Sequence, residues 1–159
     1  MTSDVIVERL RRLGLELPPQ RAPRHPYLAA RVDAGVLYLS GKTATLDGSV
    51  QFAGPLRTAE DIEHGRKAAV LCALQVLAGI EAAVGLQRVH SVLRLTGYVA
   101  SAPDFVSQPD VVNAASELLI EVLGGAGQHT RTAIGVAALP GGSAVELEAT
   151  IRLIPEADQ

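Results

Sequence analysis

The sequence is poor in cysteine and in aromatic residues. Of its 159 residues one is a cysteine, Cys72, and Trp, Tyr and Phe together make up 3%. A single cysteine excludes an internal disulfide, so the expected compartment is a reducing one, the cytoplasm. Because hydrophobic residues still make up 48%, the core has to consist of Leu, Val, Ile and Ala rather than large rings. The length corresponds to one ordinary domain.

Signals of several common protein classes are also absent. The longest apolar stretch, 68–84, is interrupted by Gln75 and Glu81 and has helical spacing, which predicts a buried helix rather than a membrane span. Residues 1–17 do not resemble a secretory signal. The four histidines lack paired spacing, so we expect no metal site. Cys72 lies within the apolar stretch, where a core thiol is expected rather than a nucleophile.

The net charge of −3 is unevenly distributed along the chain. Residues 1–31 hold six Arg and three acidic residues, which leaves the remainder at −6. Fourteen basic against seventeen acidic residues is unfavourable for nucleic-acid binding, although weak binding through the basic N-terminal segment stays open. We therefore expect neither nucleic acid nor a membrane as the main partner.

Periodicity and turn residues predict an α+β fold. Residues 4–13 have a short amphipathic pattern and a Pro-rich connector follows, so residues 1–25 are expected to form an arm ahead of a domain over 26–159. The elements expected in that domain are a hairpin of strands 28–32 and 36–40, a loop through Asp47-Gly48 and Gly54-Pro55, a helix over 58–84, a strand over 89–99, a helix over 109–123, and strands over 131–137 and 145–151. This order predicts two helices covering one face of a mixed sheet.

The other face of the predicted sheet has no cover. The residues assigned to it are Arg94, Thr96, Tyr98, Arg131, Ala133, Gly135, Ala137, Glu146, Glu148, Thr150 and Arg152, while Thr132, Ile134, Val136, Val145 and Leu147 are expected to face the helices. A solvated sheet face would explain the charges. The small residues favour close approach by another subunit in a symmetric oligomer.

Several short motifs resemble those of one protein family. They are Pro26-Tyr27, Leu39-Ser40-Gly41, Val112-Asn113-Ala114, HTRTAIGVAALP over 129–140 and VELEA over 145–149. Together they resemble the signature of the YjgF/YER057c/UK114 (Rid) family over about residues 26–154, and the N-terminal extension resembles a longer subgroup. The resemblance implies a chorismate-mutase-like homotrimer with three sites at subunit interfaces. It also implies hydrolysis of reactive enamines and imines, such as 2-aminoacrylate, to 2-keto acids and ammonia, without a metal or organic cofactor.

The resemblance also implies roles for six residues. Arg131 would bind the substrate carboxylate, Glu146 would position the hydrolytic water, and Tyr27, Ser40, Asn113 and Ala133 fall on other positions of the site. A guanidinium suits a carboxylate because it offers a planar, permanently charged fork. A partly buried Glu146 with a raised pKa could take and return a proton. At Ala133 the backbone groups could hold the substrate nitrogen.

Each assignment has a structural alternative. Arg131 could pair with a surface acid, Asn113 could be solvated or cap its helix, and Tyr27 could anchor the chain's entry to the sheet. Glu148 is expected to be structural, bonding the backbone or Arg152. Many family members have Gln at the position of Lys42 and Cys at that of Ala133, which leaves the substrate open. The alternative function is a non-catalytic trimer that binds 2-keto acids, and RNA cleavage is a third, disfavoured by the acidic balance.

Overall fold

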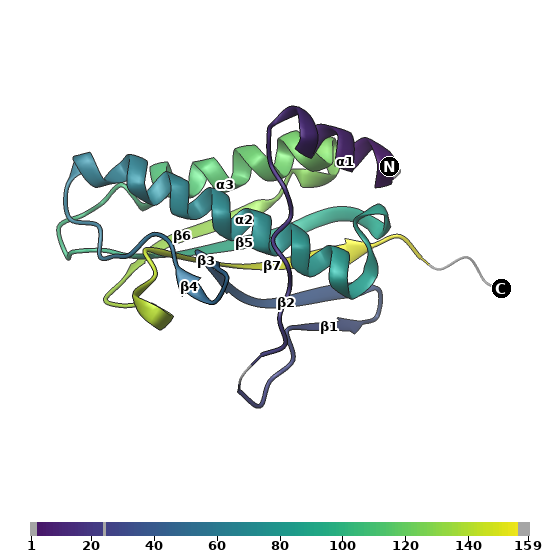
Figure 1. Ribbon diagram of the computed structural model, residues 1–159, viewed down its shortest axis with the longest axis horizontal. Helices are drawn as coiled ribbons and strands as arrows, with labels where there is room; N and C mark the ends of the chain where they lie inside the picture. The colour runs from purple at the N-terminus through teal and green to yellow at the C-terminus, as the bar shows by residue number, and fades with distance from the viewer. Residues whose placement is uncertain (1–2, 24, 156–159) are drawn as a thin grey trace.

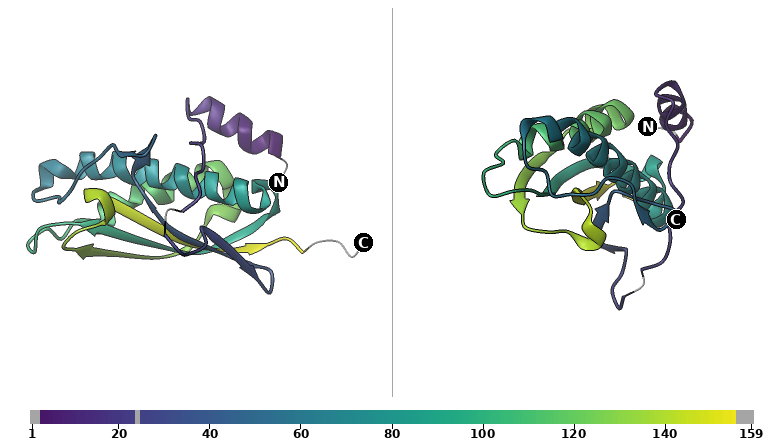
Figure 2. Two further views of the ribbon diagram at one scale, coloured as in Figure 1. Left: turned by 60° about the horizontal axis from the view of Figure 1, so that its bottom comes forward. Right: turned by 60° about the vertical axis from the view of Figure 1, so that its left-hand side comes forward.

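The structure, a computed structural model that describes residues 3–23 and 25–155, has a layer of helices on one face of a sheet (Figures 1 and 2). The helices are α1 (Ser3–Arg12), α2 (Ile62–Val84) and α3 (Gln108–Leu123). The main sheet has the order β1 (Ala30–Asp33), β2 (Val36–Thr43), β7 (Val145–Leu153), β5 (Val89–Ala100) and β6 (Thr130–Val136). Only its β5–β6 pair is parallel. The predicted α+β order is confirmed.

Two hairpins have two-residue turns in which both residues adopt positive φ. Ala34 and Gly35 (φ 46° and 73°) join β1 to β2, as the turn prediction required. Asp47 and Gly48 (φ 52° and 83°) join β3 (Thr45–Leu46) to β4 (Ser49–Val50). Positive φ at both central residues matches the right-handed twist of the flanking strands. The segment expected to be a plain loop therefore contains a small second hairpin.

The core lies between the sheet and the two long helices α2 and α3. Inward-facing β7 residues such as Leu147 and Ile151 are fully buried there, as is Cys72 of α2. The Cys72 thiol donates to the Val145 carbonyl at 3.3 Å, and burial raises its pKa well above the ordinary value. Within the described residues, Ala59–Val84 alone is long and apolar enough to span a membrane, and 56% of its most apolar window is buried. Packing against the sheet accounts for that composition, as the sequence predicted.

The N-terminal arm packs on the helical layer. Ile6 and Leu10 of α1 are buried and belong to the same core as the sheet. Arg9 Nη1 donates to the Val122 carbonyl, 3.0 Å away in the last turn of α3, where carbonyls have no partner within the helix. After α1 the chain runs down across α2 to the β1–β2 hairpin (Figure 1). The arm thus ties α3, α2 and the edge of the sheet together.

The faces predicted for β6 are wrong. Arg131 pairs with Leu95 and Ala133 with Gly97, so these β6 residues lie on the helix side with the buried side of β5. Ile134, expected to face the helices, is 43% exposed on the open side. Because α3 lies close over this edge strand, the helix side accommodates small residues and the long stem of an arginine but no bulky branched side chain.

Candidate functional site

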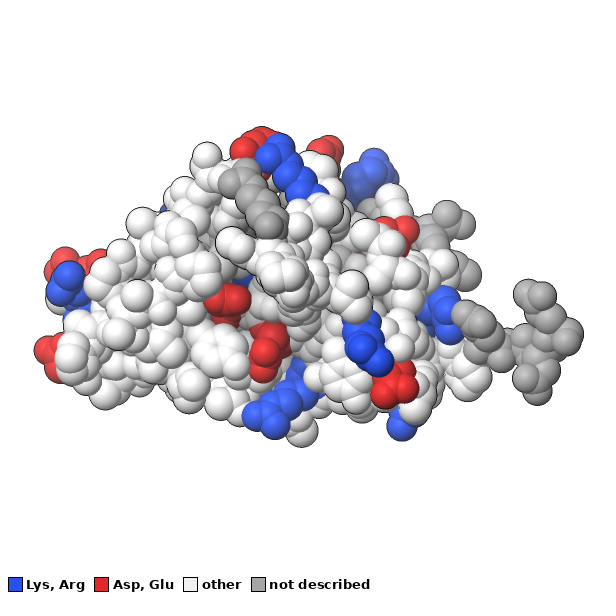
Figure 3. Space-filling model, turned by 90° about the horizontal axis from the view of Figure 1, so that it is seen from below, with Lys and Arg blue, Asp and Glu red and all other residues white. Residues whose placement is uncertain are grey.

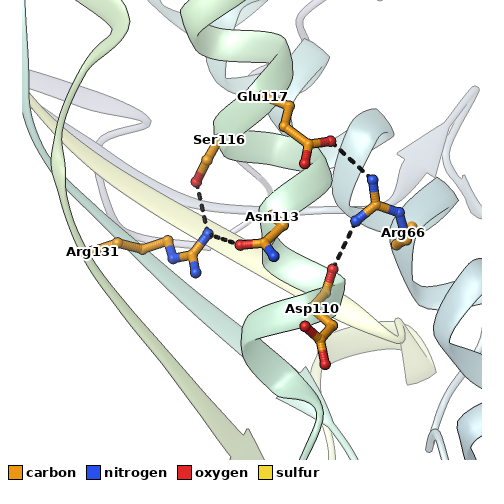
Figure 4. Close-up of polar contacts among 6 residues, drawn as sticks. All are labelled: Arg66, Asp110, Asn113, Ser116, Glu117 and Arg131. Atoms are coloured by element: carbon orange, nitrogen blue, oxygen red, sulfur yellow. Dashed lines mark hydrogen bonds and ion pairs between the residues drawn. The ribbon is translucent and has the colours of Figure 1, made fainter.

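Arg131 reaches from β6 to α3 (Figure 4). Its Nη1 donates to Asn113 Oδ1 at 2.9 Å and to Ser116 Oγ at 3.0 Å. Among the residues that the structure describes, no carboxylate pairs with Arg131, and its Nη2 and Nε make no hydrogen bond. One nitrogen therefore fixes the guanidinium while two remain able to bind an anion in a forked geometry. The surface ion pair considered as an alternative is not formed here.

A second row of contacts supports Ser116. Ser116 Oγ lies 3.0 Å from His129 Nε2, and His129 Nδ1 lies 2.6 Å from the Gly127 carbonyl. A carbonyl can only accept, so Nδ1 carries a proton, and in that tautomer Nε2 accepts the Ser116 hydroxyl proton. The Ser116 oxygen is then free to accept from Arg131. Every donor in the row has an acceptor, which holds the guanidinium in one orientation.

Ala133 contributes its backbone. The Val136 carbonyl accepts a hydrogen bond from Ser101 N, so Val136 directs its backbone groups towards β5. Backbone direction alternates along a strand, and the N–H and C=O of Ala133 therefore point to the free edge of the sheet. They lie two residues along the strand from Arg131, on the same edge as the backbone groups of Arg131 itself.

Glu146 lies on the opposite face of the sheet. It alternates with the fully buried Val145 and Leu147, so its carboxylate projects from the open face directly over Gly41, and a Cβ on Gly41 would lie 1.8 Å from Oε1. Burial, and then the charge of Glu148, raises the pKa of Glu146. Within residues 3–23 and 25–155 this carboxylate makes no hydrogen bond or ion pair. It is a half-buried base that is free to bind water.

Glu148, two residues along β7, is engaged structurally. It accepts a hydrogen bond from the Tyr98 hydroxyl at 3.1 Å, so its partner is Tyr98 rather than the backbone or Arg152. Burial and then this bond raise the pKa of Tyr98. The two neighbouring carboxylates thus differ, because one has a donor and the other has none.

Ser40 belongs to the Glu146 side, and Tyr27 is connected to it through Leu28, the next residue in the sequence. Ser40, next to Gly41, donates its hydroxyl to the Leu28 carbonyl at 2.7 Å. This bond ties the segment before β1 to β2. Tyr27 is 54% exposed, and its hydroxyl has no partner among the described residues, so the ring is free to contact a ligand or a second copy of the chain.

The six predicted residues therefore form two groups rather than one. The edge group is Arg131, Asn113 and Ala133, and the face group is Glu146, Tyr27 and Ser40. Glu146 of β7 pairs with Tyr98 of β5, which in turn pairs with Ile134 of β6. Arg131 lies three residues from Ile134 along β6, and β5 lies between β6 and β7. Arg131 and Glu146 are therefore about 10 Å apart across the strands and about 10 Å apart along them, and their side chains lie on opposite faces of the sheet. One small substrate cannot touch both groups of the same chain.

Lys42, one of the two departures from the family pattern, points away from the site. A bulge between Leu39 and Lys42 turns the side chain to the helix side, where Lys42 pairs with Leu147 and its Cε would lie 3.1 Å from a Cβ on Gly79 of α2. The residue at position 42 is thus separated from Glu146 by the sheet.

Three residues that hold the site were not singled out from the sequence. Ser116 lies one helical turn after Asn113, and His129 lies two residues before Arg131, so both spacings were visible. Gly41 was noted in a motif but not as the residue beneath Glu146. Among the described residues no group of three or more His, Cys, Asp and Glu is placed to hold a metal ion.

The fold and the two groups define a class: an α+β protein with an arginine held at a strand edge and a half-buried carboxylate on the open sheet face. The family model described as "YjgF/chorismate_mutase-like, putative endoribonuclease" matches residues 7–148. The chain belongs to this family and has its chorismate-mutase-like fold.

Three relatives are similar over nearly the whole chain. Protein TCP17 of Trypanosoma cruzi is 38% identical over 155 residues, which is 96% of this chain and 97% of TCP17. The crystal structure of Atu1372, of unknown function, from Agrobacterium tumefaciens is 37% identical with a TM-score of 0.85, covering 95% of this chain and 93% of that one. A "putative endoribonuclease" from Shewanella oneidensis is 28% identical with a TM-score of 0.87, covering 93% and 99%. The shared fold therefore includes the arm as well as the sheet.

Proposed function

We propose that the protein is an enamine/imine deaminase that hydrolyses 2-imino acids to 2-keto acids and ammonia, at sites formed between the copies of a homotrimer. The observation that carries the proposal is a pair of groups that have no ion-pair partner among the described residues, the Arg131 guanidinium at the strand edge and the Glu146 carboxylate on the open face. In a ring with heterologous contacts, the edge of each copy would meet the open face of the next. Each complete site would then take the edge group of one copy and the face group of its neighbour.

The residues suggest a sequence of proton transfers. Arg131 would hold the substrate carboxylate with its two free nitrogens, and the Ala133 carbonyl would accept an N–H of the iminium. Glu146 would take a proton from water as the water oxygen bonds to C2, giving a tetrahedral carbinolamine. Glu146 would then return that proton to the nitrogen. As the C–N bond breaks, the hydroxyl oxygen would form the C=O bond and give its own proton to Glu146, and the departing ammonia would take that proton up as ammonium while the 2-keto acid leaves. Because the C=N bond already hydrolyses in water, positioning and one acid/base group would suffice.

The raised pKa of Glu146 fits this role. A general base works best when its pKa lies near the operating pH, and burial moves an ordinary carboxyl in that direction. The neutral partners of Arg131 fit as well, because a carboxylate partner would compete with the substrate. Asn113 and Ser116 therefore act as positioning residues for Arg131.

RNA cleavage is the second candidate, because the family description and that of the Shewanella relative name an endoribonuclease. The charges disfavour it: on the side seen in Figure 3, basic side chains are scattered singly among acidic and uncharged ones. A continuous basic track along the phosphate backbone is what single-stranded RNA requires. Cleavage of RNA by highly purified protein that survives substitution of Arg131 and Glu146 would revive this function at another site.

The proposal is tested by following the decay of 2-imino acids generated by an amino-acid oxidase. The protein should accelerate decay above the spontaneous rate, and Arg131→Ala and Glu146→Gln should each abolish the acceleration while the protein stays folded. If 2-keto acids bind by calorimetry and no acceleration occurs, the protein is a non-catalytic binder instead.

Mixing the two inactive variants tests the shared site. In trimers reassembled from equal amounts of Arg131→Ala and Glu146→Gln subunits, roughly a quarter of the sites would combine an intact Arg131 with an intact Glu146 from a different copy. We expect activity to return to about that fraction. Mixed trimers as inactive as either parent would show that the two residues do not meet across an interface.

A further inference from the structure

Lys42 lies beneath the N-terminal arm, on the side of the sheet away from the face group. Its Nζ donates to Gln20 Oε1 of the arm at 2.9 Å, and Gln20 Nε2 donates to Gln75 Oε1 of α2 at 2.8 Å. Gln75 in turn donates to the Thr45 carbonyl. The arm, β2 and α2 are thus joined through a half-buried ammonium group and two neutral amides.

The positive charge of Lys42 is not compensated. Within residues 3–23 and 25–155 no carboxylate lies within ion-pair distance of Nζ, and Gln20 is its one hydrogen-bond partner. An ammonium has three donors, so two remain for a ligand. Desolvation without a counter-ion is unfavourable for the charged form, and burial lowers the pKa of Lys42 accordingly.

A cavity of about 360 Å³ opens beside this ammonium. Arg21 of the arm also lines it. Its guanidinium lies at the β3–β4 turn, where its one ion pair, with Asp47, is long at 3.8 Å and exposed, so the flexible side chain is free to turn to the cavity. Apart from Gln20 and Gly79, the rest of the lining is aliphatic: Ala29, Ala30, Val32, Leu37, Ala82 and Ala83. Gly79 of α2 leaves room for the lysine stem, because a Cβ there would be 3.1 Å from Lys42 Cε.

We propose that this cavity, named here the arm cavity, binds a short-chain monocarboxylate, with the carboxylate between Lys42 and Arg21 and the hydrocarbon tail against the alanines of α2 and the β1–β2 hairpin. The two cations and the free lysine donors select an anion, and each charge-assisted hydrogen bond is stronger than a neutral one. The apolar lining selects a tail over a fully hydrated anion such as phosphate. The site lies outside both groups of the proposed active site.

The chain offers a selective probe, because it contains only two lysines, Lys42 and Lys67. Lysine labelled with carbon-13 at Cε gives one NMR signal from each. Titration with hexanoate should shift the Lys42 signal in a saturable way and leave that of Lys67, an exposed residue of α2, unchanged. Acetate, which has no tail, should bind more weakly, and inorganic phosphate should not saturate the shift.

Two variants test separately the charge of Lys42 and the volume of the arm cavity. Lys42→Met keeps the stem and removes the ammonium, and it should weaken hexanoate binding measured by calorimetry about tenfold or more. Ala82→Leu fills the cavity from an exposed helix position and should weaken hexanoate binding without touching the lysine. Lys67→Met is the matched control and should bind as the unaltered protein does.

Three results would overturn the inference. The first is a Lys42 signal that hexanoate leaves unchanged. The second is an equal shift of both lysine signals, which indicates unspecific attraction. The third is phosphate binding at least as tight as hexanoate binding, which contradicts the apolar part of the site. Because the Lys42 signal reports one position, carboxylate binding at Arg131 cannot produce the expected result.

Discussion

The placement of Glu146 over Gly41 gives a sharp test of the proposed acid/base group. In Gly41→Ala the new Cβ would lie 1.8 Å from Oε1 and 2.8 Å from Cδ of Glu146. An ordinary contact needs about 3.3 Å, so the carboxylate has to move by about 1.5 Å. A displacement of about 1 Å in a catalytic group can cost about 100-fold in rate, and we expect kcat for imine decay to fall by about that factor.

The same substitution should leave the fold intact. Gly41 is exposed and does not adopt positive φ, so alanine suits its backbone, and the atom it displaces is the end of a flexible side chain. Turning Glu146 to another rotamer costs about 1 kcal/mol, and the reduced freedom of the unfolded chain offsets part of that. The melting temperature should change by no more than about 3 °C. Gly125→Ala, where a Cβ meets nothing within 4 Å, is the control for both measurements.

The refuting result is a folded Gly41→Ala protein with activity within about threefold of the unaltered one. Glu146 would then not be the group whose position matters, since its carboxylate cannot stay where it is. A large fall in melting temperature would instead refute the claim that only a side-chain terminus is displaced.

The remaining predictions concern charge and the arm. Glu148→Gln keeps a hydrogen-bond acceptor for Tyr98 but removes the charge that is the second cause of the raised Glu146 pKa. The acid limb of the kcat–pH profile should therefore move to lower pH. If the limb does not move, the group that titrates there is not Glu146. A carboxyl group whose pKa is raised by folding destabilises the folded state once the pH exceeds the pKa of that group in the unfolded chain. Glu146→Gln should therefore raise the melting temperature near pH 7 and leave it unchanged near pH 4. Equal increases at the two pH values would contradict this prediction. Ile6→Ala leaves a cavity at a position that is 1% exposed, and thermal denaturation should show a loss of about 2–4 kcal/mol in the free energy of unfolding. Val7→Ala, at a position that is 61% exposed, should cost less than about 1 kcal/mol. Similar losses for the two variants would mean that α1 is not part of the core.

The helices and strands were predictable because their signals are local. The helix ending at Gly85, the β1–β2 turn and the alternation along β7 each depend on residues a few positions apart. The β3–β4 hairpin was missed although Asp-Gly is a strong turn signal, since its strands have only two residues each. The support of α3 by Arg9 depends on residues 113 positions apart, which no local pattern indicates.

The roles of the residues named for the candidate site stay predictions, and their arrangement could not be predicted from the sequence. Thr132, Ile134 and Val136 alternate like residues that face a core, and β-branched side chains usually do. In an edge strand beneath a close helix the requirement reverses, since Ala133 and Gly135 fit under α3 and Arg131 extends along it to Asn113. A phase error of one residue transfers a whole strand to the other face. This error placed Arg131 and Glu146 side by side, and the correct phase is what separates them.

The two departures from the family pattern, Ala133 and Lys42, differ in their consequences because the backbone of one and the side chain of the other point to different places. Ala133 would serve the proposed site through backbone groups at the strand edge, so the loss of a cysteine side chain there leaves those groups in place. Lys42 follows a bulge, which shifts the alternation of β2 by one residue and turns its ammonium to the helix side, under Gln20. A lysine at this position therefore bears on the arm cavity, and the selection of an imine by Arg131 and Glu146 does not depend on it.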